Sequence, residues 1–92
     1  MLQVEVRGPL STITGRKLVI KRRIDNVNDL MVYLSKRFLK KAEEKGLSSI
    51  LRNFFSHNLI IVNGIEISAL NGSNTKIKSG DKVVILNIVH GG

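Results

Sequence analysis

The chain of 92 residues is long enough for one small domain with a single hydrophobic core and too short for two. Its composition, 42% hydrophobic and 24% charged, is that of an ordinary globular protein, and the absence of cysteine excludes disulfides, thiolate metal sites and catalysis by a thiol. The formal net charge of +8 favours an acidic partner, either nucleic acid or an acidic protein surface.

Two strands are predicted at the start of the chain. Residues 2–7 alternate strictly, with aliphatic side chains on one face and polar or charged side chains on the other, as in a half-buried strand. Gly8-Pro9 ends this strand, and Gly15 closes the connection to a second strand over residues 17–22. Two neighbouring strands joined in this way predict a β-hairpin.

Membrane insertion, secretion and metal binding are not predicted. No apolar run approaches the roughly 20 residues of a membrane span, and the N-terminal residues lack the basic start and apolar region of a signal peptide. The two histidines, His57 and His90, lie far apart without nearby ligand spacing. We therefore expect a soluble, cytoplasmic protein without a metal site.

Amphipathic helix patterns fill the middle of the chain. The stretch Asp25-Asn26-Val27-Asn28 supplies N-cap candidates, and Asp29 favours the positive end of a helix dipole. Apolar residues at three- and four-residue steps predict a helix over residues 29–45, which Gly46 ends. The apolar face of this helix comprises Val27, Leu30, Met31, Leu34, Phe38 and Ala42. The same spacing predicts a second, shorter helix whose buried residues are Leu47, Ile50, Leu51, Phe54 and Phe55.

The last third of the chain predicts three strands. Residues 59–62 are continuously apolar, as in a central strand that is covered on much of both faces. The Asn-Gly pair that follows favours a type I′ turn, which returns the chain as a short strand over residues 65–67. After a polar loop, a Gly-Asp turn leads into the final strand, residues 83–88, whose alternate side chains belong to opposite faces.

One α+β domain accounts for this order of elements. Two strands, two helices and three strands predict helices packed on one face of a mixed four- or five-stranded sheet. This is the order of the β-grasp, or ubiquitin-like, fold, in which the last strand lies centrally beside the first. We predict a single β-grasp domain over residues 1–92, with residues 88–92 as an extended, flexible tail. The predicted core residues are Val4, Val6, Leu34, Phe38, Ile61, Val83 and Ile85.

The sequence ends in two glycines, Gly91 and Gly92. Because neither has a Cβ, their backbone adopts extended and positive-φ conformations that other residues resist. Residues 89–92 would reach roughly 13 Å when extended, far enough to enter a partner's active site while the domain stays outside. Since the chain has no thiol, we expect the terminal carboxylate to carry its chemistry.

Three stretches carry a family resemblance: Val-Asn-Gly-Ile-Glu-Ile at residues 62–67, the strand that begins Gly80-Asp81, and the terminal glycines. With them the chain resembles the sulfur-carrier branch of the β-grasp proteins. This branch comprises the small subunit of molybdopterin synthase (MoaD), the thiamine sulfur carrier ThiS, the ubiquitin-related modifier and the small archaeal modifier proteins. Gly15 also sits where that family has a glycine, and MoaD is the nearest type.

The resemblance implies a carrier rather than an enzyme. A ubiquitin-activating-type enzyme would adenylate the carboxyl group of Gly92 with ATP, and a sulfur donor would convert it to a thiocarboxylate. His90 and Gly91 would thread the tail into that enzyme, and no cofactor is implied on the chain itself. Leu86 matches an apolar, partner-facing position of MoaD proteins, its alternative being a core position beneath a loop. Further partner-facing residues are expected at Arg7, Glu66 and Ile88.

Several pathways are compatible with this chemistry. The main prediction is a sulfur donor for molybdopterin biosynthesis that binds the large subunit of the synthase. However, Asn87-Ile88 stand where MoaD proteins usually have two prolines, and many relatives are acidic where this chain is basic. The alternatives are a ubiquitin-like modifier conjugated to target proteins and a sulfur donor for tRNA thiolation. A further alternative, suggested by the charge, is an RNA-binding β-grasp module.

The basic residues are densest at residues 21–23 and 36–41. Their simplest interpretation is a solvated face, and the alternative is a surface that steers docking to an acidic activating enzyme. The chain has four aromatic residues, at least three of them at helical core spacing, so no row of aromatic side chains is available for stacking bases.

Overall fold

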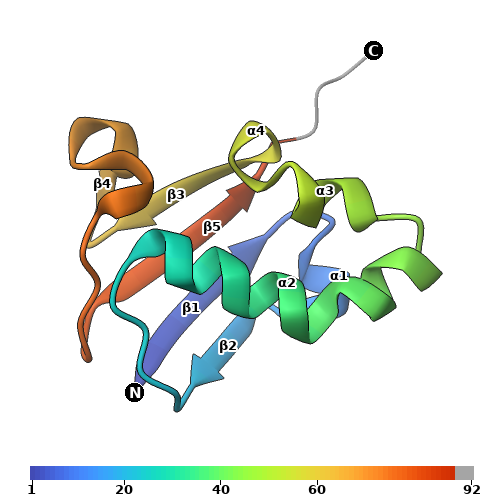
Figure 1. Cartoon of the computed structure of the whole chain (residues 1–92), viewed down its shortest axis with the longest axis horizontal. Coiled ribbons are helices and arrows are strands. Elements are labelled where there is room, and N and C mark those ends of the chain that lie inside the picture. The colour runs from blue at the N-terminus through green and yellow to red at the C-terminus, as the bar shows by residue number, and fades with distance from the viewer. Residues whose placement is uncertain (89–92) are drawn as a thin grey trace.

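The computed structural model describes residues 1–88, which form a five-stranded sheet with helices on one face (Figure 1). The strands are β1 (Leu2–Arg7), β2 (Lys17–Ile20), β3 (Asn58–Val62), β4 (Ile65–Glu66) and β5 (Lys82–Asn87). Their spatial order is β2-β1-β5-β3-β4, with β1 and β5 parallel and the other neighbours antiparallel. The predicted β-grasp fold, with the last strand beside the first at the centre, is confirmed.

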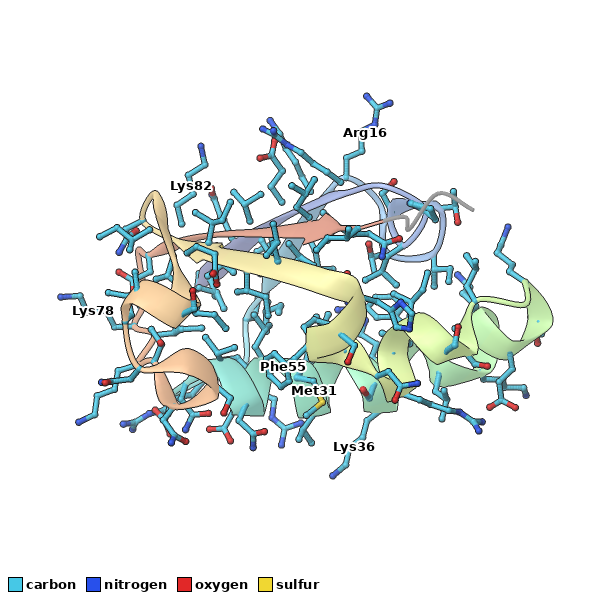
Figure 2. The ribbon with its side chains drawn as sticks, turned by 90° about the horizontal axis from the view of Figure 1, so that it is seen from above. Arg16, Met31, Lys36, Phe55, Lys78 and Lys82 are labelled. Carbon is cyan, nitrogen blue, oxygen red and sulfur yellow. The ribbon has the colours of Figure 1, made fainter. Side chains whose placement is uncertain are left out.

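All the helices of the described residues are short except α2. They are α1 (Ser11–Thr14), α2 (Val27–Glu44), α3 (Ser48–Arg52) and α4 (Phe54–His57), with 3₁₀ turns η1 (Ile67–Ala69) and η2 (Gly72–Asn74). Figure 2 views the sheet along its edge: α2 lies on one side, and Lys82 points away on the other. The buried face of α2 comprises Val27, Leu30, Leu34, Phe38 and Ala42. It packs on the inward side chains of the central strands, so the core lies between α2 and the sheet.

Both ends of α2 are capped by the residues that the sequence indicates. The side chain of Asn26 accepts a hydrogen bond from the backbone N–H of Asp29 at 2.8 Å, so the helix begins two residues earlier than predicted. At the other end Gly46 has a φ of 70°. This lets the N–H of Leu47 reach the carbonyl of Ala42 at 2.7 Å, which completes a Schellman cap and confirms Gly46 as the stop.

The second predicted helix is interrupted. Asn53, with φ −114° and ψ 54°, leaves the helical region and separates α3 from α4. The break shifts the phase of the apolar stripe, so Leu51 and Phe54 are buried while Phe55 is 42% exposed. The prediction that Phe55 belongs to the core is therefore wrong, because it assumed an unbroken helical period. The ring of Phe55 instead packs edge-on against Phe54, with centroids 5.6 Å apart.

The predicted core position of Ile61 is also wrong. In β3 the buried residues are Asn58, Ile60 and Val62, whereas Leu59 is 38% exposed and Ile61 is half-buried. The helices cover one face of the sheet, so alternate residues of β3 lie on its other face. A run of four apolar residues hides this alternation, and it suggested a strand covered on both sides. Val4, Val6, Leu34, Phe38, Val83 and Ile85 are buried as predicted, whereas Met31, Leu47 and Ile50 of the helical stripes are partly buried and pack against the core.

The three predicted turns hold the strands in register. The β1–β2 hairpin forms, although α1 occupies its connection and β2 ends at Ile20 rather than at residue 22. Asn63 and Gly64 both have positive φ, 50° and 85°, as a type I′ turn requires. The returning strand β4 is one residue shorter than predicted, because Ile67 begins η1.

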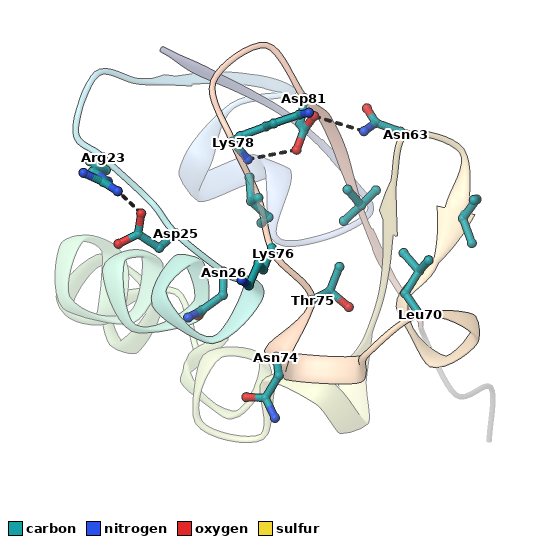
Figure 3. A pocket seen from close by; sticks show the side chains of 13 residues that line it. Arg23, Asp25, Asn26, Asn63, Leu70, Asn74, Thr75, Lys76, Lys78 and Asp81 are labelled. Carbon is teal, nitrogen blue, oxygen red and sulfur yellow. Dashed lines mark hydrogen bonds and ion pairs between the residues drawn. The ribbon is translucent and has the colours of Figure 1, made fainter.

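The turn into β5 is fastened by the carboxylate of Asp81 (Figure 3). It accepts hydrogen bonds from the side-chain amide of Asn63 at 3.1 Å and from the backbone N–H of Lys78 at 2.9 Å. These two hydrogen bonds, in that order of importance, hold the pKa of Asp81 below its ordinary value. The side-chain oxygen of Asn63 in turn accepts the N–H of Lys82, so both turns at this end of the sheet are joined.

Candidate functional site at the base of the C-terminal tail

The predicted tail follows β5, the central strand of the sheet. β5 pairs along its length with β1 on one side and β3 on the other, so the backbone is held on both edges. Val83, Ile85 and Asn87 face α2 and are buried. The chain therefore reaches the tail from the most firmly held part of the domain. The predicted threading and activation residues His90, Gly91 and Gly92 lie outside the described residues.

The end of β5 is attached to the start of β3. The carbonyl oxygen of His57 accepts two hydrogen bonds, one from the backbone N–H of Ile88 at 2.7 Å and one from the side-chain amide of Asn87 at 2.9 Å. Opposite Asn87 in the β3–β5 register, Asn58 donates its side-chain amide to the carbonyl of Phe54 at 2.8 Å. These bonds link the strand end to α4, so the direction in which the chain leaves the body is set at Ile88.

Gly8 approaches the same strand end from the other side. Its φ of 98° is in the region that favours glycine, and a Cβ built there would lie 2.9 Å from the Cβ of Asn87. The turn after β1 can therefore lie against Asn87 only because position 8 has no side chain. We call Asn87 and Ile88 the tail base. The turn after β1 and the end of α4 both lie against it.

The sheet face that no helix covers is called the open sheet face. Beside the end of β5 it carries a cluster of apolar residues, Leu59, Ile61, Val84 and Leu86, and Val19 lies on the same face in β2. Leu86, 36% exposed, has Arg7 as its partner in β1 and Leu59 as its partner in β3. These apolar side chains are continuous across two central strands because each pair shares a register position. The side chain of Arg7 forms an ion pair with Glu5 at 3.0 Å along the border.

The predicted partner-facing residues border one surface. Leu86 and Arg7 are neighbours on the open sheet face, and Ile88 follows at the strand end, half-buried. Glu66 lies at the β4 edge of the same face, paired with Ile61. Its carboxylate accepts hydrogen bonds from the hydroxyl and the backbone N–H of Ser68, which lower its pKa and engage it as the cap of η1. Leu59 and Ile61 border Leu86 and Val84 on this face. The sequence did not predict this, because residues 59–62 are all apolar and show no alternation.

A hollow of about 870 Å³ lies away from the end of β5, between the start of α2, the β3–β4 turn and the segment before β5 (Figure 3). Two of its charged side chains, Arg23 and Asp25, pair with each other at 2.7 Å, and the carboxylate of Asp81 is held by the side-chain amide of Asn63. Over residues 1–88, no group of three His, Asp or Glu side chains could hold a metal ion. In the same residues no helix is long and apolar enough to cross a membrane.

Comparisons with known proteins agree with this geometry. The profile of the ThiS family matches residues 4–92. No curated protein sequence matches the chain significantly. The solution structure of small archaeal modifier protein 1 from Methanosarcina acetivorans is similar, with a TM-score of 0.72 and 21% identity over 99% of this chain and 95% of that one.

Two structures of complexes also contain a similar chain. One is the BexX/CysO complex of Amycolatopsis orientalis, with a TM-score of 0.67, 17% identity and complete coverage of both chains. The other is the complex of subunits 1 and 2 of the molybdopterin-converting factor from Helicobacter pylori, with a TM-score of 0.58 and 21% identity over 99% of this chain and 97% of that one. Proteins of this type are small carriers or modifiers rather than enzymes, and they bind protein partners. The chain belongs to the ThiS family of ubiquitin-fold sulfur carriers.

Proposed function

We propose that the carboxyl group of Gly92 is adenylated by a ubiquitin-activating-type enzyme and then converted to a thiocarboxylate. The observation that carries this proposal is the anchored end of β5, where the central strand is fastened at Ile88 beside an exposed apolar surface. The residues after Ile88 can extend by at most about 3.3–3.6 Å each. A partner that docks on the open sheet face is therefore within reach of the tail.

The proposed chemistry follows from the absence of cysteine and from the terminal carboxyl group. The chain has no cysteine, so a carried sulfur must replace an oxygen of the terminal carboxyl group. A carboxylate is a poor acceptor for a nucleophile until an oxygen attacks the α-phosphate of ATP and pyrophosphate leaves. The sulfur nucleophile then attacks the acyl carbon of the adenylate, and AMP leaves. ATP and the sulfur donor belong to the partner, and this chain supplies the carboxyl group and the glycines that admit it to a narrow site.

Docking is assigned to the apolar residues beside the tail base. Leu86 and Leu59, both more than a third exposed, form its centre, and Val84 and Ile61 extend it. Exposed apolar residues that are contiguous mark interaction surfaces more often than scattered ones do. Since the sheet places them next to the departing tail, one partner can hold the domain and the tail together.

Sulfur transfer to molybdopterin is the pathway that we propose first. The similar chain from Helicobacter pylori belongs to a complex of two subunits of the molybdopterin-converting factor, which supports a large-subunit partner. The similarity to a small archaeal modifier protein supports conjugation to target proteins, or sulfur transfer to another acceptor such as tRNA, as the alternative. Both share the activation of Gly92 and diverge only after it.

Intact-mass measurement tests the common step. After incubation with the activating enzyme, ATP and a sulfur donor, the C-terminal peptide should exchange one oxygen for one sulfur. Leu86→Asp places a charge in the docking surface and should weaken the reaction at least about tenfold, because a desolvated charge opposes association. Val32→Asp is the matched control, since Val32 is 37% exposed but lies on α2, on the other side of the molecule. Equal effects of the two substitutions would contradict docking at Leu86.

A further inference from the structure

The outer edge of β2 has unpaired backbone groups. In an antiparallel pair, opposed residues alternate between pairs that exchange hydrogen bonds and pairs that do not. The N–H of Val6 bonds to the carbonyl of Arg16 at 2.8 Å, and from there every second pair of the β1–β2 register is hydrogen-bonded. Lys17 and Val19, which lie in the pairs that are not hydrogen-bonded, turn their backbone N–H and C=O groups away from β1. We call these groups the β2 edge, and Lys21 follows β2 directly.

No other segment covers the β2 edge within residues 1–88. β2 is the terminal strand of the sheet, and its backbone groups that point outward have no hydrogen-bond partner in that part of the chain. Figure 1 shows β2 on the outer side of β1, with α2 crossing one face of the sheet. An exposed strand edge of this kind is a template for another extended chain. The opposite edge, β4, offers only two residues, Ile65 and Glu66.

The surroundings of the β2 edge are basic. Lys17 lies on the edge itself, Lys21 and Arg22 follow it, and Arg22 and Lys36 both line a hollow of about 260 Å³, which Asp29 also lines. None of these four cations forms an ion pair within the described residues, whereas the neighbouring Arg23 is paired with Asp25. Lys36 points away from the body of the molecule (Figure 2). The edge therefore attracts acidic chains.

Apolar side chains flank the β2 edge on both faces. Val19 is 45% exposed on the open sheet face, and Val32 is 37% exposed on α2, where it lines the hollow together with Ile24. A strand added beside β2 would direct alternate side chains to these two sides, since successive residues of a strand point to opposite faces. Apolar residues of the added strand would meet Val19 or Val32, and acidic residues would meet the cations.

We propose that the β2 edge binds an extended, acidic segment of a partner protein as a sixth strand of the sheet. Main-chain hydrogen bonds to Lys17 and Val19 would supply binding, and the basic side chains would select acidic segments. The β2 edge is separate from the end of β5, because β1 lies between β2 and β5. Both surfaces are therefore available to bind at the same time, and this proposal does not depend on the activation of Gly92.

A protein segment is favoured over RNA by the unpaired edge itself. Phosphates would use the cations but would leave the backbone carbonyls of Lys17 and Val19 without donors. Single-stranded RNA is also bound by stacking on exposed aromatic rings. The aromatic residue that lines the hollow, Tyr33, is half-buried and accepts a hydrogen bond from Arg37 at 2.6 Å. We therefore treat RNA as the competing outcome of the test.

The test uses an end-blocked synthetic peptide of alternating valine and glutamate, of about eight residues, which is the usual length of a strand. Amide hydrogen exchange of the whole protein is followed by NMR with and without this peptide. We expect slower exchange at Lys17 and Val19, and binding that weakens as salt rises. The matched control peptide, alternating valine and lysine, should leave these amides unchanged. Protection elsewhere, or none, would overturn the proposal.

Two variants separate the backbone from the charge. Val19→Pro removes an N–H that bonds nothing within the described residues, so β2 should remain paired with β1 while the peptide binds at least about tenfold more weakly. Unchanged exchange at Val4 would show that the hairpin is intact, and Val19→Ala, which retains the N–H, should still bind. Lys21→Glu should weaken binding, whereas Lys45→Glu, at the far end of α2, should not.

RNA binding is the competing outcome, and an oligouridylate tests it. If an oligouridylate shifts the signals of Lys21 and Arg22 while the valine–glutamate peptide protects no edge amide, the cations belong to an RNA surface and the proposal fails. Thiocarboxylate formation should be the same in Val19→Pro as in the parent chain. Failure at the β2 edge is thereby distinguished from failure of the proposed activation at Gly92.

Discussion

The carbonyl oxygen of His57 accepts the backbone N–H of Ile88 at 2.7 Å, one residue beyond the last residue of β5. This bond connects the end of α4 with the point at which the predicted tail begins. Because Ile88 is held, the tail starts from a defined position relative to the open sheet face. The reach of the terminal carboxylate is therefore counted from Ile88.

Shortening the tail should abolish activation while the fold is retained. Deleting Gly92 retracts the carboxylate by one residue, roughly 3.3 Å, and misplacement by about 1 Å can cost a hundredfold in rate. Gly91→Val adds a β-branched side chain to a segment that must enter a narrow channel, and it should also block the reaction. Adenylation is measured by pyrophosphate release. Parent-like rates in both variants, with unchanged thermal unfolding, would exclude the tail as the functional end.

Gly8→Ala should destabilise the domain and disturb the tail base. The added methyl group would lie 2.9 Å from the Cβ and 3.1 Å from the carbonyl oxygen of Asn87, in addition to the strain of a φ of 98°. Gly64→Ala is the matched control, because Gly64 also has a positive φ, 85°, but a Cβ added there would meet no atom of a more distant residue within 4 Å. Strain alone costs of order 1–3 kcal/mol, so urea unfolding should show a larger loss for Gly8→Ala than for Gly64→Ala. Equal losses would mean that the contact with Asn87 is unimportant.

Leu34→Ala tests the packing of α2 on the sheet. Leu34 is fully buried, and its truncation should lower the free energy of unfolding by about 2–5 kcal/mol. On the exposed side of the same helix, Val32→Ala should change it by less than about 0.5 kcal/mol. Both values come from denaturant titrations. Similar values for the two substitutions would contradict the orientation of α2.

Asp81 should make stability depend on pH in the acid range. Its folded-state pKa is lowered, so the unfolded chain takes up a proton first, and the stabilisation is fully present above the ordinary value of 3.8 and lost as pH falls below it. Asp81→Asn removes this ionisation. The difference in urea midpoint between pH 7 and pH 3 should therefore be smaller in the variant than in the parent chain. Equal differences would assign the acid sensitivity to other carboxylates.

Most of the fold was predictable because its signals are local. The cap at Asn26, the stop at Gly46 and the Asn63-Gly64 turn each depend on the backbone preferences of one or two residues. Placing the last strand beside the first followed from the order of elements, not from any contact visible in the sequence. The bounds of β2 and the break at Asn53 were missed, since tertiary packing decides them.

The candidate site was predictable only in part. Leu86 could be assigned to the open sheet face because β5 alternates, whereas the exposure of Leu59 was hidden in a run of four apolar residues. The approach of Gly8 to Asn87 and the bond from Ile88 to His57 join residues that are distant in sequence. No periodicity reports such contacts, so the tail base emerged only from the structure. The roles of His90, Gly91 and Gly92 stay predictions.

The position of β5 has a consequence for the synthesis of the protein. In the sheet of residues 1–88, β5 alone joins the β1–β2 hairpin to the β3–β4 hairpin, and it is the last strand to leave the ribosome. Until residues 82–87 emerge, the two hairpins share no ladder, and their closure must await contacts of long sequence separation. A chain that stops before β5 would therefore lack both the assembled sheet and the route to the tail. A chain truncated before β5 should therefore be unfolded and degraded by proteases, and it should not compete with the full chain for the partner.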